Sequence, residues 1–278
     1  MARTPEQNNA IITGNIPRQL LLFFFPIWLG TMFQQLYNTV DTLIVGNFVG
    51  TQALAAVGAT SSFVQLLVGL FVGLCSGAGV IIAQSFGAGD HDEVNRQVHT
   101  ALALAIAGGA ALTVIGLLIS RPVLRLMQTP DEIVGMASEY LQIYFLGMIP
   151  QMIYNMGTNI LRAVGDSKRP LYFLIVCALA NTALDLLFVA GFRLGTAGAA
   201  IATSLSQLIC AGLVVWTLAR IPGACRLQLS ELRFDRALLG RITAIGLPAG
   251  LASVMYSAAN VIIQKAINLL GTDAAAAW

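Results

Sequence analysis

The stretch LYFLIVCALANTALDLLFVAGF, from Leu171 to Phe192, contains a single charged residue, Asp185. An α-helix needs about 20 mostly apolar residues to cross the roughly 30 Å hydrocarbon core of a bilayer. The stretch is long enough to do so, and it therefore predicts a membrane-spanning helix. Its carboxylate requires an explanation, because an ionisable side chain at that depth costs about 2.5–3.5 kcal/mol on insertion scales.

The composition of the whole chain agrees with a membrane environment. Charged residues make up 10% of the sequence, hydrophobic residues make up 57%, and the mean hydropathy is +0.78, whereas about a quarter of an ordinary soluble domain is charged. The net charge of +2 gives no reason to expect a nucleic-acid partner. The four cysteines lack the spacing of a metal site or a disulfide framework and are interpreted as packing residues: Cys75, Cys177, Cys210 and Cys225.

The apolar segments are too long and continuous for the alternating pattern of a β-barrel, so they predict an all-α polytopic membrane protein. Each segment is long enough to span a bilayer, and several are longer than the minimum, which predicts tilted helices or helices that extend beyond the membrane. The predicted spans are residues 19–45, 53–86, 94–120, 133–160, 170–192, 197–219 and 238–270.

The basic residues set the expected orientation, because cytoplasmic loops of membrane proteins are enriched in lysine and arginine. A cytoplasmic N-terminus places three arginines on the outer side: Arg121, Arg125 and Arg193. It places eleven basic residues inside: Arg3, Arg18, Arg96, Arg162, Lys168, Arg169, Arg220, Arg226, Arg233, Arg236 and Arg241. We therefore expect a multi-pass protein of the cell (inner or plasma) membrane with its N-terminus in the cytoplasm.

The first and seventh spans repeat one another, as expected for a transporter built from duplicated halves. Pro26 aligns with Pro248 and Asn38 with Asn260, and after a one-residue gap Asn47, Gly50 and Thr51 align with Asn268, Gly271 and Thr272. An even number of helices separates the copies, so both should have the same orientation. The pattern predicts the first half of a protein of about twelve spans, truncated after its seventh helix.

Several motifs in a fixed order resemble the multidrug and toxic compound extrusion (MATE) family, within the wider group that includes lipid-linked oligosaccharide flippases. They are Pro26, Gln34, Asp41, VGNFVG from Val45, LAAVG from Leu54, AQSFGAGD (Ala83–Asp90), LRAVGDSKRP (Leu161–Pro170), NTALD (Asn181–Asp185) and GAAIATSLSQ (Gly198–Gln207).

The resemblance implies a MATE/MOP-flippase fold of two six-helix lobes that uses a Na⁺ or H⁺ gradient to expel organic, often cationic, compounds. The domains are then a cytoplasmic N-terminus (1–18), a six-helix N-terminal lobe (19–219), a cytoplasmic inter-lobe linker (220–237) and the first helix of a C-terminal lobe (238–278). Asp41 with Asn181 and Asp185 is similar to the DinF-like branch, whose cation site lies in the N-terminal lobe.

The residues themselves also favour a cation site. Of the acidic residues, Asp41 and Asp185 alone lie well inside predicted spans. Asn181 and Asp185 are four apart and share one helix face, and the distances to loop glycines place Asp41, Asp185 and Thr203 at matching depth in the outer half of the lobe. Two carboxylates, an amide carbonyl and a hydroxyl suit Na⁺, the one metal ion expected here, or a shared proton.

Other polar residues in the spans are weaker candidates. Gln34, Tyr37 and Asn38 lie within two turns of Asp41 and are candidates to line a cavity, although Tyr37 also fits an interfacial anchor. Three polar residues of the predicted fourth span either form a network or simply cap that helix: Asn155, Thr158 and Asn159. Pro26 is either a mobile bend, coupled to the occupancy of Asp41, or a static kink.

Residues 225–241, CRLQLSELRFDRALLGR, have leucine and arginine at helical spacing and are expected to lie along the inner membrane surface. No ATP-binding loop occurs in the sequence, and no cofactor is expected beyond the coupling ion. We expect a transporter, monomeric when full length, rather than an enzyme. The alternatives are a lipid-linked saccharide flippase, which the scarcity of intramembrane basic residues disfavours, and an intramembrane aspartyl enzyme, whose YD and GxGD motifs are missing around both aspartates.

Overall fold

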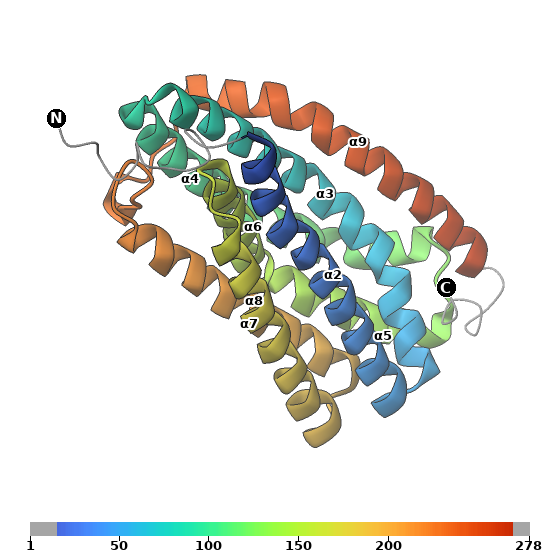
Figure 1. Cartoon of the computed structure of the whole chain (residues 1–278). Helices are drawn as coiled ribbons and strands as arrows, with labels where there is room; N and C mark the ends of the chain where they lie inside the picture. The colour runs from blue at the N-terminus through green and yellow to red at the C-terminus, as the bar shows by residue number, and fades with distance from the viewer. Residues whose placement is uncertain (1–15, 269–278) are drawn as a thin grey trace.

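The computed structural model describes residues 16–268, which form a bundle of helices with no strand in that range (Figure 1). This confirms the predicted all-α fold. The helices are α2 (Ile16–Phe48), α3 (Thr51–Ala88), α4 (His91–Leu126), α5 (Asp131–Leu146), α6 (Met148–Ala163), α7 (Lys168–Asp185), the π-helical turn η1 (Leu186–Gly191), α8 (Gly195–Arg220), the 3₁₀ turn η2 (Leu229–Glu231) and α9 (Arg236–Asn268). Most of the predicted N-terminal tail, and the repeat positions after Asn268, lie outside the described residues.

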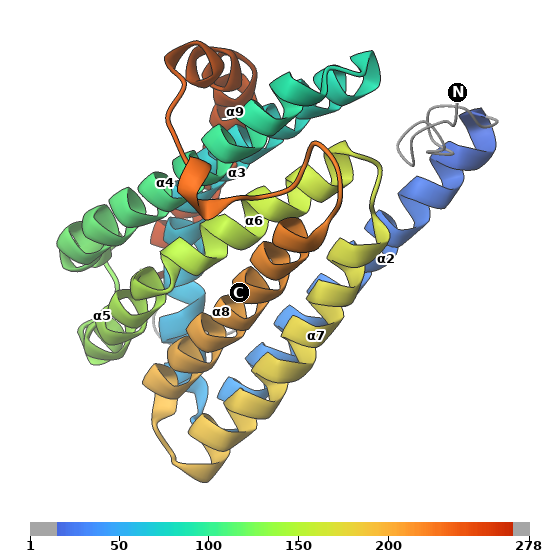
Figure 2. The same cartoon turned by 90° about the vertical axis from the view of Figure 1, so that its left-hand side faces the viewer.

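Six helices of the described part are long and apolar enough to cross a membrane: α2, α3, α4, α7 with η1, α8 and α9. The predicted fourth span, residues 133–160, is not one helix. It consists of α5 and α6, of 16 residues each, which follow one another in about the same direction (Figure 2). Together they cover the length of a span that neither reaches alone.

The break between α5 and α6 occurs at Gly147, where α8 approaches closely. A Cβ atom added to Gly147 would lie 2.6 Å from the Ser204 hydroxyl oxygen of α8. Hydroxyls of two neighbouring helices donate to carbonyls near the end of α5: Thr113 to Phe145 O at 2.8 Å and Ser204 to Ile143 O at 3.3 Å. Side-chain donors of this kind allow a helix to break inside a membrane, because carbonyls released from the helix keep a partner.

The helix α6 forms the centre of the bundle, where it packs against α3, α4 and α8. It buries four large apolar side chains at intervals of four residues: Met148, Met152, Met156 and Ile160. By contrast with the buried α6, the helix α2 contacts mainly α7 (Figure 2). It exposes large apolar side chains such as Leu21, Phe24 and Phe25. Exposed apolar side chains on a spanning helix are those expected to face lipid or a second lobe.

The two helices of the predicted repeat, α2 and α9, each contain 33 residues and an internal proline, Pro26 in one and Pro248 in the other. They run in the same general direction through the molecule (Figure 1). They occupy different positions, because α2 packs on α7 whereas α9 lies along α3.

The segment between α8 and α9 folds differently from the regular helix that its leucine and arginine spacing suggested. Between Ile221 and Asp235 the structure contains only the short turn η2, after a positive φ of 106° at Gly223. Cys225 and Leu227 are buried in the core, and α9 starts where the Asp235 carboxylate accepts a hydrogen bond from the backbone N–H of Ala237. The segment is therefore docked on the bundle, and its predicted place at the membrane surface stays a prediction.

Candidate functional site

Asp41 lies on the face of α2 that borders a cavity of about 330 Å³. The cavity is also lined by Gln34, Tyr37 and Asn38, which precede Asp41 by seven, four and three residues. Side chains at these spacings share one face of an α-helix. The three candidates on α2 are therefore brought to the same cavity as the aspartate.

Asp185 ends α7 at the point where the helix widens into the π-helical turn η1. Such turns often occur at functional sites. The Asp185 side chain is completely buried, as is that of Asn181 one turn earlier. Asn181 Nδ2 lies 3.5 Å from the Thr203 hydroxyl oxygen of α8, and Thr203 lines the cavity.

The carboxyl groups of Asp41 and Asp185 are close enough to share a hydrogen bond when one of them carries a proton. The four residues predicted to form a cation site, Asp41, Asn181, Asp185 and Thr203, are thus brought together by α2, α7 and α8.

The oxygen atoms of this group have few partners. Both carboxylate oxygens of Asp185, Oδ1 of Asp41 and Oδ1 of Asn181 are buried and find no hydrogen-bond partner among the described residues. Buried polar atoms almost always have a partner, and a buried carboxylate without one is especially costly. The donor set, hard oxygen atoms only, fits Na⁺ or a proton that neutralises the pair.

The structure adds cavity residues that the sequence analysis missed. Tyr140 and Tyr144 of α5 line the cavity with their rings stacked, the centroids 6.0 Å apart and the planes 19° from parallel. Gln151 of α6 donates a hydrogen bond to the Tyr144 hydroxyl at 3.2 Å, and Gln207 of α8 completes this side of the cavity. The spacing of four and then seven residues in Tyr140, Tyr144 and Gln151 is the signal that could have found them.

The candidates from the predicted fourth span, Asn155, Thr158 and Asn159, lie on α6 and do not line this cavity. Asn155 donates to the Gln151 carbonyl at 3.0 Å, and both Thr158 and Asn159 donate to the Asn155 carbonyl, at 3.0 and 2.9 Å. Their polar groups bond along α6 itself. Pro26 also lies away from the cavity, within an α2 that continues as one helix on both sides of it.

Comparison with known proteins identifies the family. The MatE family model matches residues 26–187, more than half of the chain. The chain belongs to the MatE family. A MatE relative from Bacillus subtilis, the probable multidrug resistance protein YpnP, is 34% identical over 272 residues, which cover 93% of the chain and 58% of YpnP.

Solved MatE-type structures confirm the fold and include two conformations. An outward-facing multidrug resistance MATE transporter of the MOP superfamily matches with a TM-score of 0.85 and 26% identity over 94% of the chain and 57% of its own length. An inward-facing structure matches with a TM-score of 0.80 and 27% identity over 88% of the chain and 56% of its own length. The chain thus spans a little over half the length of these relatives, and it is a multi-pass membrane protein of this transporter family.

Proposed function

We propose that the chain forms the first lobe, and the first helix of the second lobe, of a multidrug efflux antiporter. The antiporter exchanges Na⁺ or H⁺ for small organic, often cationic, compounds across the cell membrane, and its N-terminus lies in the cytoplasm. The observation that carries this proposal is the pair Asp41 and Asp185, of which three carboxylate oxygen atoms are buried without a hydrogen-bond partner beside a polar and aromatic cavity. Ionisable residues inside a membrane normally face a cavity and have a functional role.

The position of Asp41 suggests how exchange occurs. Asp41 lines the cavity, whereas Asp185 does not line it and is fully buried. A cation that enters between the two carboxylates neutralises the charge that an organic cation in the cavity would otherwise meet. The two ligands therefore compete for Asp41, and binding of one lowers the affinity for the other, as an antiporter requires.

The match to the outward-facing relative is better in TM-score and in coverage than the match to the inward-facing one. With this support we propose that the present conformation corresponds to the outward-facing state. In this state a cation from outside reaches Asp41 and Asp185, and substrate leaves the cavity on the same side.

Two other functions are less consistent with the site. A flippase for anionic lipid-linked saccharides calls for a basic cavity, yet the residues that line this one include no lysine or arginine within the described part. An intramembrane hydrolase uses an aspartate pair open to a peptide bond, whereas Asp185 is completely buried and does not line the cavity. A transporter rather than an enzyme is therefore proposed.

The test is efflux of a fluorescent cationic dye from liposomes that contain the full-length two-lobe protein, under an imposed Na⁺ or pH gradient. Asp41→Asn and Asp185→Asn should each abolish gradient-driven efflux while the protein still folds. Glu139→Gln is the matched control, because Glu139 is exposed on the face of α5 that points away from the buried core. Unchanged efflux in both aspartate variants would show that the site has only a structural role.

A further inference from the structure

The backbones of α9 and α3 approach one another closely at a set of glycines. A Cβ atom added to Gly73 of α3 would lie 2.2 Å from the Gly250 nitrogen of α9, and one added to Gly77 would lie 2.6 Å from the Gly246 nitrogen. Small residues allow helices in membranes to approach this closely. In the proposed two-lobe protein α9, which repeats α2, is the first helix of the second lobe, and this glycine contact is then a contact between lobes.

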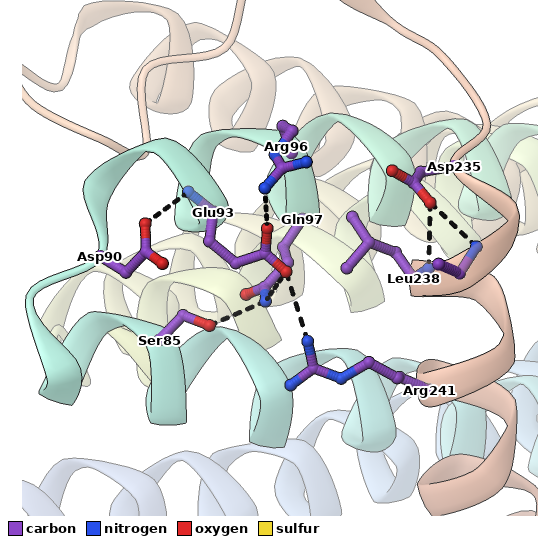
Figure 3. Close-up of polar contacts among 9 residues, drawn as sticks. Ser85, Asp90, Glu93, Arg96, Gln97, Asp235, Leu238 and Arg241 are labelled. Atoms are coloured by element: carbon purple, nitrogen blue, oxygen red, sulfur yellow. Dashed lines mark hydrogen bonds and ion pairs between the residues drawn. The ribbon is translucent and has the colours of Figure 1, made fainter.

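An ion pair also links the same two lobes, at one end of the contact between α3 and α9 (Figure 3). Glu93 of α4 accepts a hydrogen bond from Arg241 of α9, with Nη1 and Oε1 3.3 Å apart, and also pairs with Arg96 of its own helix. Glu93 is held in place from inside by the buried Gln97, whose Nε2 lies 3.3 Å from Glu93 Oε1 and 2.8 Å from Ser85 Oγ. The carboxylate is thus positioned by the first lobe and meets a cation of the second.

The exposure of this ion pair makes it suitable for reversible contact. The Glu93 side chain is 16% exposed and the Arg241 side chain 51% exposed. A pair that water can reach is weak and separates without leaving a buried charge.

The ion pair lies near the first residues of α4 and α9, at the end of the bundle that carries most of its basic residues, which is the cytoplasmic end in the proposed orientation. We propose that Glu93 and Arg241 form a latch that closes the cytoplasmic side of the space between the lobes in the outward-facing state and opens in the inward-facing state. This inference rests on the proposed function, because it assumes two lobes that alternate.

The test measures how often the cytoplasmic side is open in the full-length protein. Spin labels are attached at Gly87→Cys and Gly240→Cys, after replacement of all native cysteines of the full-length protein, and their distance distribution is recorded by double electron–electron resonance. Both glycines face open space, with no atom within 4 Å of an added Cβ. A short distance reports the closed latch, and a longer one reports opening.

Glu93→Gln and Arg241→Gln should each raise the ratio of long to short distances about two- to five-fold, the effect of losing one exposed ion pair. The double variant should resemble either single variant, because both remove the same interaction. Arg96→Gln is the matched control: it removes the other partner of Glu93 within α4 and should leave the ratio unchanged. Arg241→Lys keeps the charge and should retain most of the closed population.

Additive effects of the two substitutions, or an equal effect of Arg96→Gln, would overturn the latch.

The failure of the latch and the failure of the proposed function give different results. If the Glu93 and Arg241 variants leave the distances unchanged while gradient-driven efflux depends on Asp41, the antiporter stands and the latch is wrong. If the distances respond as expected but no gradient drives efflux, the latch stands and the antiport proposal is wrong.

Discussion

Replacement of Gly73 with alanine tests the close contact between α3 and α9. The added methyl group would lie 2.2 Å from the Gly250 nitrogen and 2.3 Å from the Gly250 Cα. These are backbone atoms of another helix, so no side-chain rotation relieves the overlap, and the two helices must separate. We expect the protein to fold with α9 displaced from α3.

The magnitude follows from two opposing effects. Overpacking of a close contact costs about 1–3 kcal/mol, whereas alanine is favoured over glycine inside a helix by up to about 1 kcal/mol. The net destabilisation is about 1–2 kcal/mol, which corresponds to a fall in Tm of about 2–8 °C at about 2–4 °C for each kcal/mol.

The assay uses the native thiols. All four cysteines are free and buried, so a dye that fluoresces on reaction with thiols reports their exposure as the detergent-solubilised protein is heated. Gly212→Ala is the matched control, because Gly212 lies inside α8 with no atom within 4 Å of an added Cβ. This control should have an unchanged or higher Tm. The contact is refuted if Gly73→Ala is as stable as Gly212→Ala.

Three further predictions concern other sites. Asp185→Asn should raise Tm in the absence of Na⁺, because it removes a buried charge without a partner, and it should abolish any increase in Tm that Na⁺ produces in the wild type; a lower Tm in the variant would contradict the reading of this residue as a functional charge. Thr113→Val should cost about 1 kcal/mol through the loss of its hydrogen bond to the Phe145 carbonyl of the neighbouring helix, whereas Thr182→Val, whose hydroxyl bonds within its own helix, should cost less; equal Tm values for the two variants would exclude that role. His99→Ala should speed proteolysis of the segment between α8 and α9, because His99 Nε2 accepts a hydrogen bond from the backbone N–H of Gln228 at 3.0 Å; an unchanged cleavage rate would show that this bond does not hold the segment.

The spanning helices were predictable because their signal is local. Long apolar runs and sparse charges predict a membrane helix without reference to any other part of the chain. The grouping of Asp41 with Asp185 was predictable for a related reason: few acidic residues lie inside the apolar runs, and their distances to the loops gave matching depths.

The break between α5 and α6 is only partly visible in its own segment. Pro150, in the first turn of α6, lacks the N–H that would bond the Leu146 carbonyl at the end of α5, but the donors that stabilise the break, Thr113 and Ser204, come from α4 and α8. The course of the segment before α9 was missed for a similar reason. Its leucine and arginine spacing suits a helix, but tertiary contacts decide its conformation, through the burial of Cys225 and Leu227 against the bundle.

The aromatic side of the cavity was missed because tyrosine has two common roles in membrane helices. Tyr140 and Tyr144 fit an interfacial position as well as a cavity, and only the packing of α5 against α3 and α8 places them beside Asp41. Asn155 and Asn159 were candidates because of their residue type alone. Their hydrogen bonds along α6 show that side-chain orientation, which the sequence does not give, decides between a cavity residue and a helix-bonded one.

In the proposed mechanism, cation and organic compound exchange through the pair Asp41 and Asp185. Coupling of this kind is reciprocal, so the most direct measurement drives the reaction from the substrate side. Liposomes with the full-length protein are loaded with a cationic dye and diluted without any ion gradient, and internal Na⁺ and pH are recorded. Dye efflux should draw one of these cations inward in a fixed ratio, and Asp185→Asn should abolish the cation movement. Dye efflux with no accompanying movement of Na⁺ or H⁺ would contradict this mechanism.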